Sequence, residues 1–349
     1  MTARPAKLQS KSEGANSTVI ECSEELDSQL QALVELIGAR ERFLVVGHAS
    51  PDGDAVGSTL GLALILEQEG KDVTVYNRDP IPYNFRFLPG ASQWQTELES
   101  DAAFDVTILL DCAEPTRIGE DFPDNGWGET IAVVDHHKTW DEEFADLYVR
   151  DPKAAATGEL LYHLGARLGA ITLDVAKNLY CCMMTDTGSF RYSNTSRTAF
   201  RIAGELVELG VNPWEMTSEV YENQPVERLE LLSQVLQTLS VSSCGRLAFL
   251  RVEKEMFREV EGAGDLTDGF INYARSIREV EVATQLREVG DGSWRISFRS
   301  RGAVDVSRLA EKFGGGGHHN AAGCRIEANP DEIEEQLSAA LVELLTPDE

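Results

Sequence analysis

The sequence predicts an α/β protein in which a parallel-sheet domain is followed by a smaller α+β domain. Short apolar runs without polar alternation are typical of strands buried on both faces of a parallel sheet. Four such runs occur in the first half of the chain, at residues 43–46, 73–76, 106–110 and 131–134. Helical patterns separate them, as in βαβ units. After Asn223-Gln224-Pro225 the pattern changes to strand-like segments and a glycine run.

The other elements of the first domain are helical. Apolar residues recur at helical spacing from Leu26 to Ile37 and predict an opening amphipathic helix. A second helix is expected after the first strand, at 56–69, and a helical block covers about 155–222. Within this block we expect three helices, at 157–168, 174–184 and 198–209.

The second domain is expected to combine strands with helices. A connecting helix is followed by three strands, a glycine run and a final helix, at 226–239, 246–252, 279–287, 293–300, 314–317 and 331–345. A chain of 349 residues suits two domains better than one. We therefore expect four parts: a disordered tail (1–22), the first domain (23–222), a linker helix (223–241) and the second domain (242–349).

The charge balance limits the partners of the protein. The sequence has 31 Lys and Arg against 59 Asp and Glu, a net charge of −28. Proteins that hold long nucleic acids neutralise many phosphates with basic side chains, so no long strand is expected to bind. The ordinary alternative is that the acidic surface serves solubility alone. The sequence also predicts no membrane span, and six cysteines without a C-x-x-C pair suggest free thiols in the cytoplasm.

Acidic and imidazole side chains gather where predicted strands end. They are His48, Asp52 and Asp54 after the first strand, Asp111 after the third, and Asp135, His136 and His137 at the fourth. In an open parallel sheet, ligands bind beyond the carboxyl ends of the strands, so these side chains are expected to converge. Each has an ordinary alternative by itself, because Asp is a frequent turn residue or helix cap. Three of the six histidines nevertheless stand at these ends.

Asp186 adds a carboxylate at the end of a predicted helix. The helix dipole disfavours negative charge there, so a compensating cation is one explanation and a solvent-facing side chain is the other. The candidate ligands are thus His48, Asp52, Asp54, Asp111, His136 and Asp186. Four carboxylates balance the charge of two divalent ions. Oxygen-rich ligation with some imidazole favours Mn²⁺, with Mg²⁺ as the alternative, over metals that prefer thiolates.

These motifs resemble those of the DHH phosphoesterases. The resemblance rests on four motifs in order: His48-x-x-x-Asp52-x-Asp54, Asp111, Asp135-His136-His137 and Thr185-Asp186-Thr187-Gly188. The run from Gly314 to Gly323 is similar to the signature of the DHH-associated domain. The likeness covers roughly residues 25–345. It is greatest to members that degrade oligoribonucleotides and dephosphorylate 3′-phosphoadenosine 5′-phosphate (pAp).

The resemblance implies a role for each of these residues. It assigns the ligands to two ions that share Asp111: His48, Asp52 and Asp111 on one, and Asp54, Asp111, His136 and Asp186 on the other. His137 would face the scissile phosphate, and Asp135 is expected to orient an imidazole. Two ions of this kind activate water as a hydroxide that attacks phosphorus, and they stabilise negative charge on the phosphate oxygens.

Substrate selectivity is expected from the second domain. Consecutive glycines let backbone N–H groups approach a phosphate, and a flexible linker is the alternative. Arginines on one face of a strand suit a terminal phosphate, unless that face is merely solvated. The candidates are Gly315, Gly316, Gly317 and His318 in the glycine run, Arg299 and Arg301 on the strand before it, and Asn272 and Arg275 in a stretch that resembles the family's substrate-lining helix.

The expected activity is hydrolysis of short oligoribonucleotides, about two to five nucleotides long, to nucleoside 5′-monophosphates, and of pAp to AMP. The nearest alternative is a cyclic-dinucleotide phosphodiesterase acting on c-di-AMP or pApA. A single-strand DNA exonuclease would need a further binding domain and a basic channel, and a catalytically silent nucleotide sensor would not need a complete ligand set. An inorganic pyrophosphatase would lack the glycine run. The resemblance also leaves a homodimer open.

Overall fold

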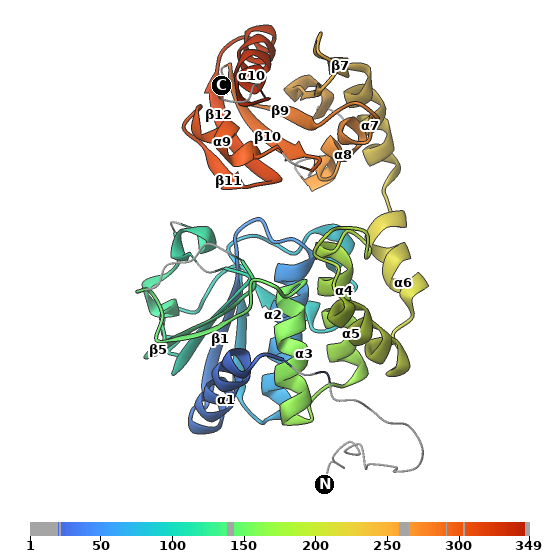
Figure 1. Cartoon of the computed structure of the whole chain (residues 1–349). Helices are drawn as coiled ribbons and strands as arrows, with labels where there is room; N and C mark the ends of the chain where they lie inside the picture. Colours follow the sequence, from blue (N-terminus) through green and yellow to red (C-terminus); the bar gives the residue numbers. More distant parts are fainter. Residues whose placement is uncertain are drawn as a thin grey trace. The chain divides into compact units, whose positions relative to one another are not determined.

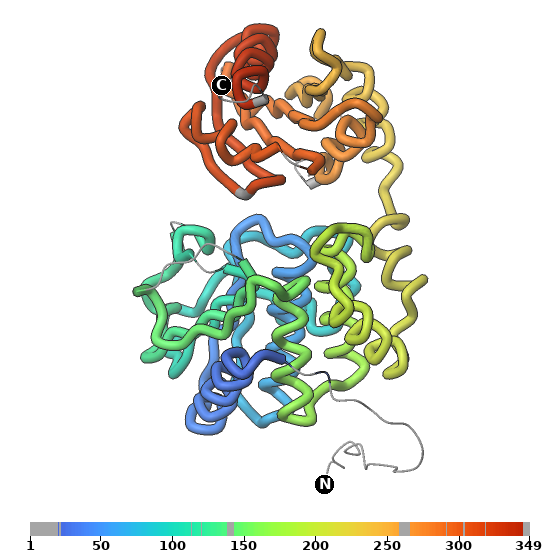
Figure 2. The backbone as a smooth tube through the Cα atoms, viewed as in Figure 1, coloured from blue at the N-terminus to red at the C-terminus, as the bar shows by residue number. Residues whose placement is uncertain are grey.

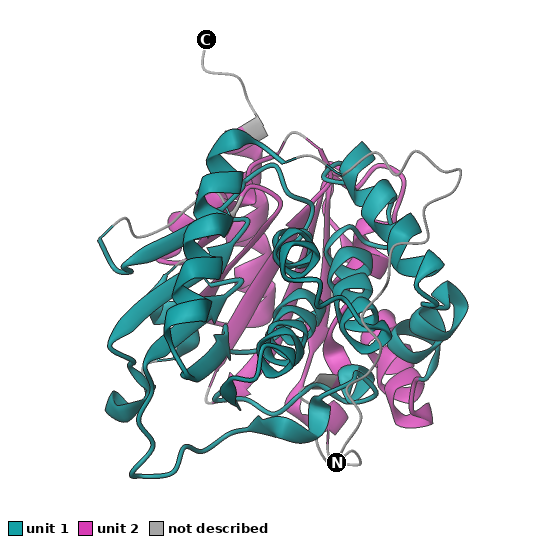
Figure 3. Cartoon of the chain, turned by 90° about the horizontal axis from the view of Figure 1, so that it is seen from below, with its two compact units in different colours: residues 1–223 teal, residues 224–349 magenta. Residues whose placement is uncertain are grey.

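The computed structural model describes residues 20, 22–112, 114–119, 121–137, 143–257, 265–290, 292–302 and 304–345. The chain divides into two compact units, residues 1–223 and 224–349, which Figure 3 shows in teal and magenta. Most of the tail expected at 1–22 lies outside the described residues. Among the described residues, no helix has the length and apolar character needed to cross a membrane.

The first unit is built on a parallel sheet, as predicted (Figure 1). The strand order is β3-β2-β1-β4-β5-β6, with β1 (Arg42–Gly47), β2 (Asp72–Tyr76), β3 (Trp94–Gln95), β4 (Val106–Leu110), β5 (Thr130–Asp135) and β6 (Leu147–Arg150). The four predicted strands are β1, β2, β4 and β5. The edge strands β3 and β6 were not predicted, because two to four residues carry too little apolar pattern.

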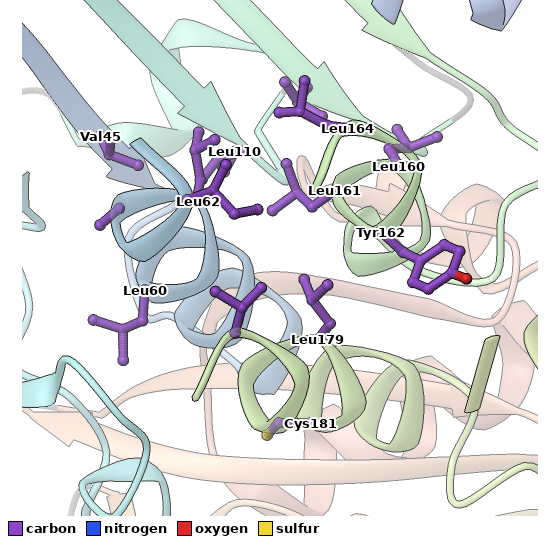
Figure 4. Close-up of a cluster of buried hydrophobic side chains, with 14 of the residues drawn as sticks. Val45, Leu60, Leu62, Leu110, Leu160, Leu161, Tyr162, Leu164, Leu179 and Cys181 are labelled. Carbon is purple, nitrogen blue, oxygen red and sulfur yellow. The ribbon is translucent and has the colours of Figure 1, made fainter. Parts of the chain in front are cut away.

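Helices cover one face of this sheet. The helices of the first unit are α1 (Glu24–Ala39), α2 (Gly53–Gln68), α3 (Thr157–Leu168), α4 (Leu173–Asp186), α5 (Arg197–Glu208) and α6 (Pro213–Thr217), the last continuing into η5 (Ser218–Glu222). The backbone tube in Figure 2 traces α3, α4 and α5, which form the predicted helical block. The main core lies between the sheet and these helices. Leu62 of α2, Leu110 of β4 and Leu161 of α3 lie together within it (Figure 4).

Loops and short turns cover the other face. Leu44, Val46 and Leu109 point to this side and pack in a second apolar cluster. Phe122 and Trp127 are in ring contact there, with centroids 4.5 Å apart. The turns of the first unit are η1 (Tyr83–Phe85), η2 (Ala91–Gln93), η3 (Pro115–Ile118) and η4 (Asp124–Gly126).

The strand order determines where a ligand can bind. The chain adds β2 and β3 on one side of β1, then crosses back to add β4, β5 and β6 on the other. At such a switch point, loops from neighbouring strands diverge and leave a crevice at their carboxyl ends. The crevice therefore lies beyond β1, β4 and β5.

The second unit contains a mixed sheet, which agrees with the smaller α+β domain that the sequence predicts. Its strand order is β11-β12-β10-β9-β8-β7, with β7 (Ser240–Val241), β8 (Leu247–Val252), β9 (Val282–Gly290), β10 (Ser293–Ser300), β11 (Gly316–His318) and β12 (Ala321–Glu327). Among the described strands of this second sheet, only β8 and β9 pair in parallel.

Helices lie on both faces of the second sheet. They are α7 (Val226–Gln237), α8 (Ile271–Arg275), α9 (Val306–Glu311) and α10 (Pro330–Leu345), with the turns η6 (Lys254–Phe257) and η7 (Asp265–Thr267). On one face, Ile296 and Phe298 pack with Leu309 of α9 and Leu337 of α10. The opposite face is buried over β8 and β9, which α7 and α8 contact.

Candidate metal centre

Three neighbouring strands bring candidate ligands to one edge of the first sheet. β1, β4 and β5 run parallel, with Gly47 beside Leu110 and Leu110 beside Val134. The strands therefore end at the same level. His48 follows β1, Asp111 follows β4, and Asp135 ends β5 just before His136 and His137.

Asp52 and Asp54 are positioned by the start of α2. Asp52 is the N-cap residue, and its Oδ1 accepts from the backbone N–H groups of Asp54 and Ala55, both at 3.1 Å. The capping role that was the ordinary alternative for Asp54 thus belongs to Asp52, and Asp54 is buried. Gly53 stands between them because a Cβ atom there would lie 2.5 Å from the Thr185 side chain.

His48, Asp52 and Asp111 form a first group of candidate ligands. Nε2 of His48 lies 3.8 Å from Oδ1 of Asp52 and 3.5 Å from Oδ2 of Asp111. Nδ1 of His48 lies 2.9 Å from the backbone oxygen of Ala49. Because Nδ1 is engaged by this carbonyl, Nε2 is the ring nitrogen that faces the carboxylates and is available to a metal.

Asp54, His136 and Asp186 form a second group. Nε2 of His136 lies 3.7 Å from Oδ2 of Asp54 and 3.7 Å from Oδ2 of Asp186. Nδ1 of His136 is 3.2 Å from the backbone oxygen of Ala154, so Nε2 is again the atom available to a metal. Asp186 is the last residue of α4, as predicted.

Asp111 stands between the two groups. Its Oδ2 lies 3.5 Å from Nε2 of His48, and its Oδ1 lies 3.5 Å from Nε2 of His136. Asp111 also has a left-handed backbone (φ 55°), which an aspartate tolerates better than most residues. The structure therefore brings the six predicted ligands together around one shared carboxylate. That they hold ions stays a prediction.

Two residues that the sequence analysis did not single out hold these carboxylates. The hydroxyl of Thr157 donates to Oδ1 of Asp111 at 3.0 Å, and the backbone N–H of Thr157 donates to Oδ2 of Asp54 at 2.7 Å. Nδ2 of Asn194 donates to Oδ2 of Asp186 at 3.2 Å. Thr157 begins α3, where backbone N–H groups have no partner inside the helix. A threonine at the start of a helical pattern was the only available signal.

Asp135 is paired with His137. Oδ1 of Asp135 lies 2.6 Å from Nδ1 of His137 and accepts from its backbone N–H at 3.0 Å. This contact fixes the imidazole ring, the kind of orienting role that the sequence suggested for Asp135. Nδ1 of His137 also lies 3.4 Å from Oδ1 of Asp111, so the ring stands beside the shared carboxylate.

The acidic groups of this centre are buried close together, which shifts the pKa values of several of them. Burial raises the pKa of Asp54 well above its usual range, and the neighbouring Asp111 adds to this effect. Burial also raises the pKa of Asp186 to about 7. For His48, burial by itself lowers the pKa, but hydrogen bonds to Asp111 and Asp52 raise it to about 11. Carboxylates gathered in this way are destabilising unless cations neutralise them.

The donor atoms fit divalent cations that prefer oxygen and imidazole. Among the described residues, the ion pairs of Asp54 and Asp111 are all with imidazoles, and no Lys or Arg neutralises either carboxylate. The nearby thiols are unsuitable ligands, because burial raises the pKa of Cys112 to about 12 and that of Cys182 well above its usual range. The set therefore matches Mn²⁺ or Mg²⁺ better than zinc in a thiolate site.

The glycine run of the second unit is part of the sheet. Residues 316–318 form β11, which pairs antiparallel with β12. A Cβ atom at Gly315 would lie 2.1 Å from the backbone oxygen of Gly323, and one at Gly317 would lie 2.5 Å from Cα of Ala322. Close packing on β12 therefore requires two of these glycines. A flexible linker is excluded, and phosphate binding by the run stays a prediction.

The other candidates for substrate binding lie around the same sheet. Arg299 is half-buried on β10, and Arg301 follows that strand, exposed, with Nη1 3.3 Å from the backbone oxygen of Arg278. Asn272 and Arg275 lie on α8, which contacts β9 and β10. Their roles also stay predictions.

An acidic, imidazole-rich cluster at the carboxyl edge of a parallel sheet, in a chain with a separate mixed-sheet unit, indicates a metal-dependent phosphoesterase. Residues 42–185 match the DHH family, N-terminal domain, and residues 259–345 match the DHHA1 domain. The chain belongs to the DHH family of phosphoesterases, which confirms the resemblance seen in its motifs.

Several individual proteins are similar to this chain over most of its length. The bifunctional oligoribonuclease and PAP phosphatase NrnA of Thermus thermophilus is 33% identical over 321 residues, covering 91% of this chain and 95% of that protein. The cyclic-di-AMP phosphodiesterase PdeA of Listeria monocytogenes is 28% identical over 331 residues, covering 89% of this chain and 49% of that protein. A crystal structure of an exopolyphosphatase-related protein from Bacteroides fragilis has a TM-score of 0.82 at 29% identity, covering 91% of this chain and 96% of that chain.

Proposed function

We propose that this chain is a two-metal phosphoesterase that hydrolyses short oligoribonucleotides to nucleoside 5′-monophosphates and pAp to AMP. The observation that carries the proposal is the position of Asp111, whose two carboxylate oxygens face two groups of candidate ligands. A carboxylate shared in this way suits two ions side by side. Similarity to the Thermus thermophilus NrnA over nearly the whole of both chains supports the substrate class.

The candidate groups define which residues would hold the ions. His48, Asp52 and Asp111 would hold one, and Asp54, Asp111, His136 and Asp186 the other. We infer Mn²⁺, with Mg²⁺ as the alternative, from the oxygen and imidazole donors. When bound, such ions activate water for attack on phosphorus and stabilise charge on the phosphate oxygens. Backbone carbonyls hold both imidazoles with Nε2 facing the carboxylates.

His137 would act on the substrate itself. Asp135 engages Nδ1 of His137, so Nε2 is the ring nitrogen that remains for a substrate. A proton passed to the leaving oxygen, or a hydrogen bond donated to a phosphate oxygen, would therefore come from Nε2. Asp135 acts here through His137 and is a positioning residue.

The preference for short substrates follows from charge. With 59 acidic and 31 basic residues, the chain repels a long polyanion and needs local positive sites to hold even a short one. The candidates for that role are in the second unit, where Arg299 and the N–H groups of residues 315–318 would hold a phosphate. A length of about two to five nucleotides fits this balance.

A cyclic-dinucleotide phosphodiesterase is the second candidate function. The match to PdeA of Listeria monocytogenes favours it, since 28% identity extends over 89% of this chain. The chain spans about half of that protein, so the likeness covers only part of PdeA. A cyclic and a linear dinucleotide present the same phosphodiester, and hydrolysis rates decide between them.

The test is a substrate panel with Mn²⁺. It would contain pAp, linear di- to pentanucleotides, a cyclic dinucleotide, pyrophosphate and long single-stranded DNA, with the double variant Asp135→Ala/His136→Ala as control. We expect Mn²⁺-dependent release of mononucleotides from the short RNAs, AMP from pAp, and neither product from the variant. Fastest turnover of the cyclic dinucleotide would favour the second function. Binding of nucleotides without any turnover would indicate a sensor and refute both.

A further inference from the structure

A row of three arginines crosses one face of the second sheet. Arg295 of β10 stands directly opposite Arg287 of β9 on one side and directly opposite Arg325 of β12 on the other. Side chains at directly opposite positions in an antiparallel sheet point to the same face and lie close together. The row is not evident from the sequence, because only the strand register places the three residues opposite one another.

Two of the three arginines in the row, Arg295 and Arg325, are open to solvent. Arg287 is half-buried with its guanidinium 5.5 Å from the ring centroid of Phe257. In the part of the chain that the structure describes, the guanidinium groups of Arg295 and Arg325 have no carboxylate within ion-pair distance. Glu327 lies on the same face at the end of β12, yet it forms no ion pair with Arg325.

Such a row is unfavourable unless an anion covers it. Like charges at directly opposite positions destabilise a sheet. Acidic residues outnumber basic ones by 59 to 31 in this chain, so acidic partners for the row would have been easy to place. Guanidinium groups pair well with phosphate because their planar donors match two of its oxygens.

The row lies on the same face of the sheet as Arg299, which is proposed above to hold a phosphate. Arg295, Ser297 and Arg299 alternate along β10 with the buried residues of the opposite face. Between the two arginines, Ser297 stands beside Gly323 of β12, which in turn pairs with Gly316 of β11. These small residues leave a stretch of the sheet surface without bulky side chains. A ligand lying along β10 would therefore meet the guanidinium of Arg295 at one end of this stretch and that of Arg299 at the other.

The spacing sets the length of ligand that reaches both ends. Four residues of an antiparallel strand span about 14 Å. Stacked nucleotides in one strand rise about 3.4 Å each, so a phosphate at the row lies about four nucleotides from one at Arg299, or fewer if the chain is extended. Neither pAp nor a dinucleotide is long enough to reach both.

We propose that Arg287, Arg295 and Arg325 form a phosphate-binding subsite. It would hold the phosphate that lies farthest from Arg299 in oligonucleotides of four to five residues. The subsite rests on the proposed function, because it extends the binding of the same substrate. It explains how a protein of net charge −28 accepts the longer members of its substrate range: three basic groups on one sheet face act locally where the whole surface is repulsive.

The test compares substrates of different length in a double variant, Arg295→Gln/Arg325→Gln, in the full chain with Mn²⁺. We expect the KM for a pentanucleotide to rise roughly three- to tenfold, and its dependence on salt to weaken by about one phosphate contact or more. The KM and kcat for pAp and a dinucleotide should stay within about twofold, which also shows that the variant is folded.

A matched control loses the same charge elsewhere. Arg308→Gln/Lys312→Gln removes two cations from exposed positions of the same unit, on and next to α9, which packs on the opposite face of the sheet. This control should leave the pentanucleotide KM unchanged. The subsite would be overturned by equal effects of both double variants, or by an unchanged pentanucleotide KM in Arg295→Gln/Arg325→Gln. In either case, turnover by the wild type still upholds the proposed function. A wild type that cleaves none of the three substrates overturns the function and the subsite together.

Discussion

The hydroxyl of Thr157 donates to Oδ1 of Asp111 at 3.0 Å, while the backbone N–H of the same threonine donates to Oδ2 of Asp54 at 2.7 Å. One residue in the first turn of α3 thus ties a carboxylate at the end of β4 to a carboxylate in the first turn of α2. Oδ1 of Asp111 is also the oxygen that faces His136. The start of one helix therefore sets the geometry of the shared ligand.

Removing the hydroxyl of Thr157 should weaken metal binding. Thr157→Val keeps the shape of the side chain and its backbone N–H but no longer orients Asp111. Residues that orient metal ligands typically contribute about 10–100-fold to metal affinity, and we expect a loss in that range. The Mn²⁺ concentration for half-maximal activity, together with calorimetric titration of Mn²⁺, measures it. Thr157→Ser retains the hydroxyl and should bind nearly as tightly as the wild type; equal Mn²⁺ affinity of all three proteins would rule out this role.

Replacing the shared carboxylate should stabilise the protein when no metal is present. In Asp111→Asn, a buried negative charge that raises the pKa of both Asp54 and Asp186 is gone. The new amide oxygen can still accept a hydrogen bond from His48. If the relieved repulsion is worth about 1 kcal/mol, the Tm in chelator should rise by about 2–4 °C. Addition of Mn²⁺ should raise the Tm of the wild type but hardly that of the variant, and activity should be lost. A lower Tm in chelator would show that Asp111 is not under electrostatic strain.

His137 should affect turnover and leave metal content intact. None of the six proposed ligands is changed in His137→Ala, so bound Mn²⁺ per chain should match the wild type. Loss of a general acid typically lowers kcat by about 10²- to 10⁴-fold. Elemental analysis of the loaded protein beside steady-state kinetics separates the two effects. Asp135→Asn should reduce kcat less, because the ring remains and only the contact that orients it changes. Unchanged turnover in His137→Ala would remove the imidazole from the mechanism.

The glycine run offers a matched pair of substitutions. In Gly317→Ala the new methyl group would lie 2.5 Å from Cα of Ala322, and the backbone there has φ 145°, so the second unit should lose stability. Gly316→Ala meets no atom within 4 Å and should fold normally. If the run binds phosphate, Gly316→Ala should still raise the KM for pAp, since a methyl group would obstruct the approach of the ligand. Thermal unfolding and pAp kinetics test both, and normal KM with normal stability in Gly316→Ala would speak against phosphate binding at this position.

Acid should destabilise the first unit through His163. Burial, together with the nearby Arg167, lowers the pKa of His163 to about 4 from its usual 6.5. Above pH 6.5 the ring is neutral in both states and contributes nothing to pH dependence. As the pH falls from 6.5 to about 4, the unfolded chain binds a proton that the folded chain does not, and stability falls by up to about 3 kcal/mol. His163→Leu should lose less stability between pH 7 and pH 5 than the wild type in urea unfolding with chelator. Identical losses would show that His163 titrates normally.

Local patterns accounted for most of the secondary structure. The helix predicted at 157–168 has the bounds of α3, and the strand predicted at 106–110 has those of β4. These elements carry their own periodicity or apolar run, so their neighbours in sequence suffice. The strands β3 and β11 are two and three residues long, and only their pairing with β2 and β12 defines them.

The candidate ligands could be predicted from the sequence because each follows a recognisable strand or helix, and the strand order then brings them together. Thr157 could not be predicted in this way, because its hydrogen bond to Asp111, 46 residues away, leaves no local sequence pattern. Asn194 likewise has no sequence signal that marks it, yet its amide donates to Asp186.

The sequence by itself determined the kinds of side chain present at the strand ends, the fold class and the periodic elements that build the fold, because these depend on residues close together along the chain. Tertiary structure alone decided that the two oxygens of Asp111 face two different histidines and that one threonine holds two carboxylates. It also decided that Arg287, Arg295 and Arg325 lie in one row. Those relationships depend on strand register and on which faces of sheets and helices meet, and register is a property of paired segments that no single segment encodes.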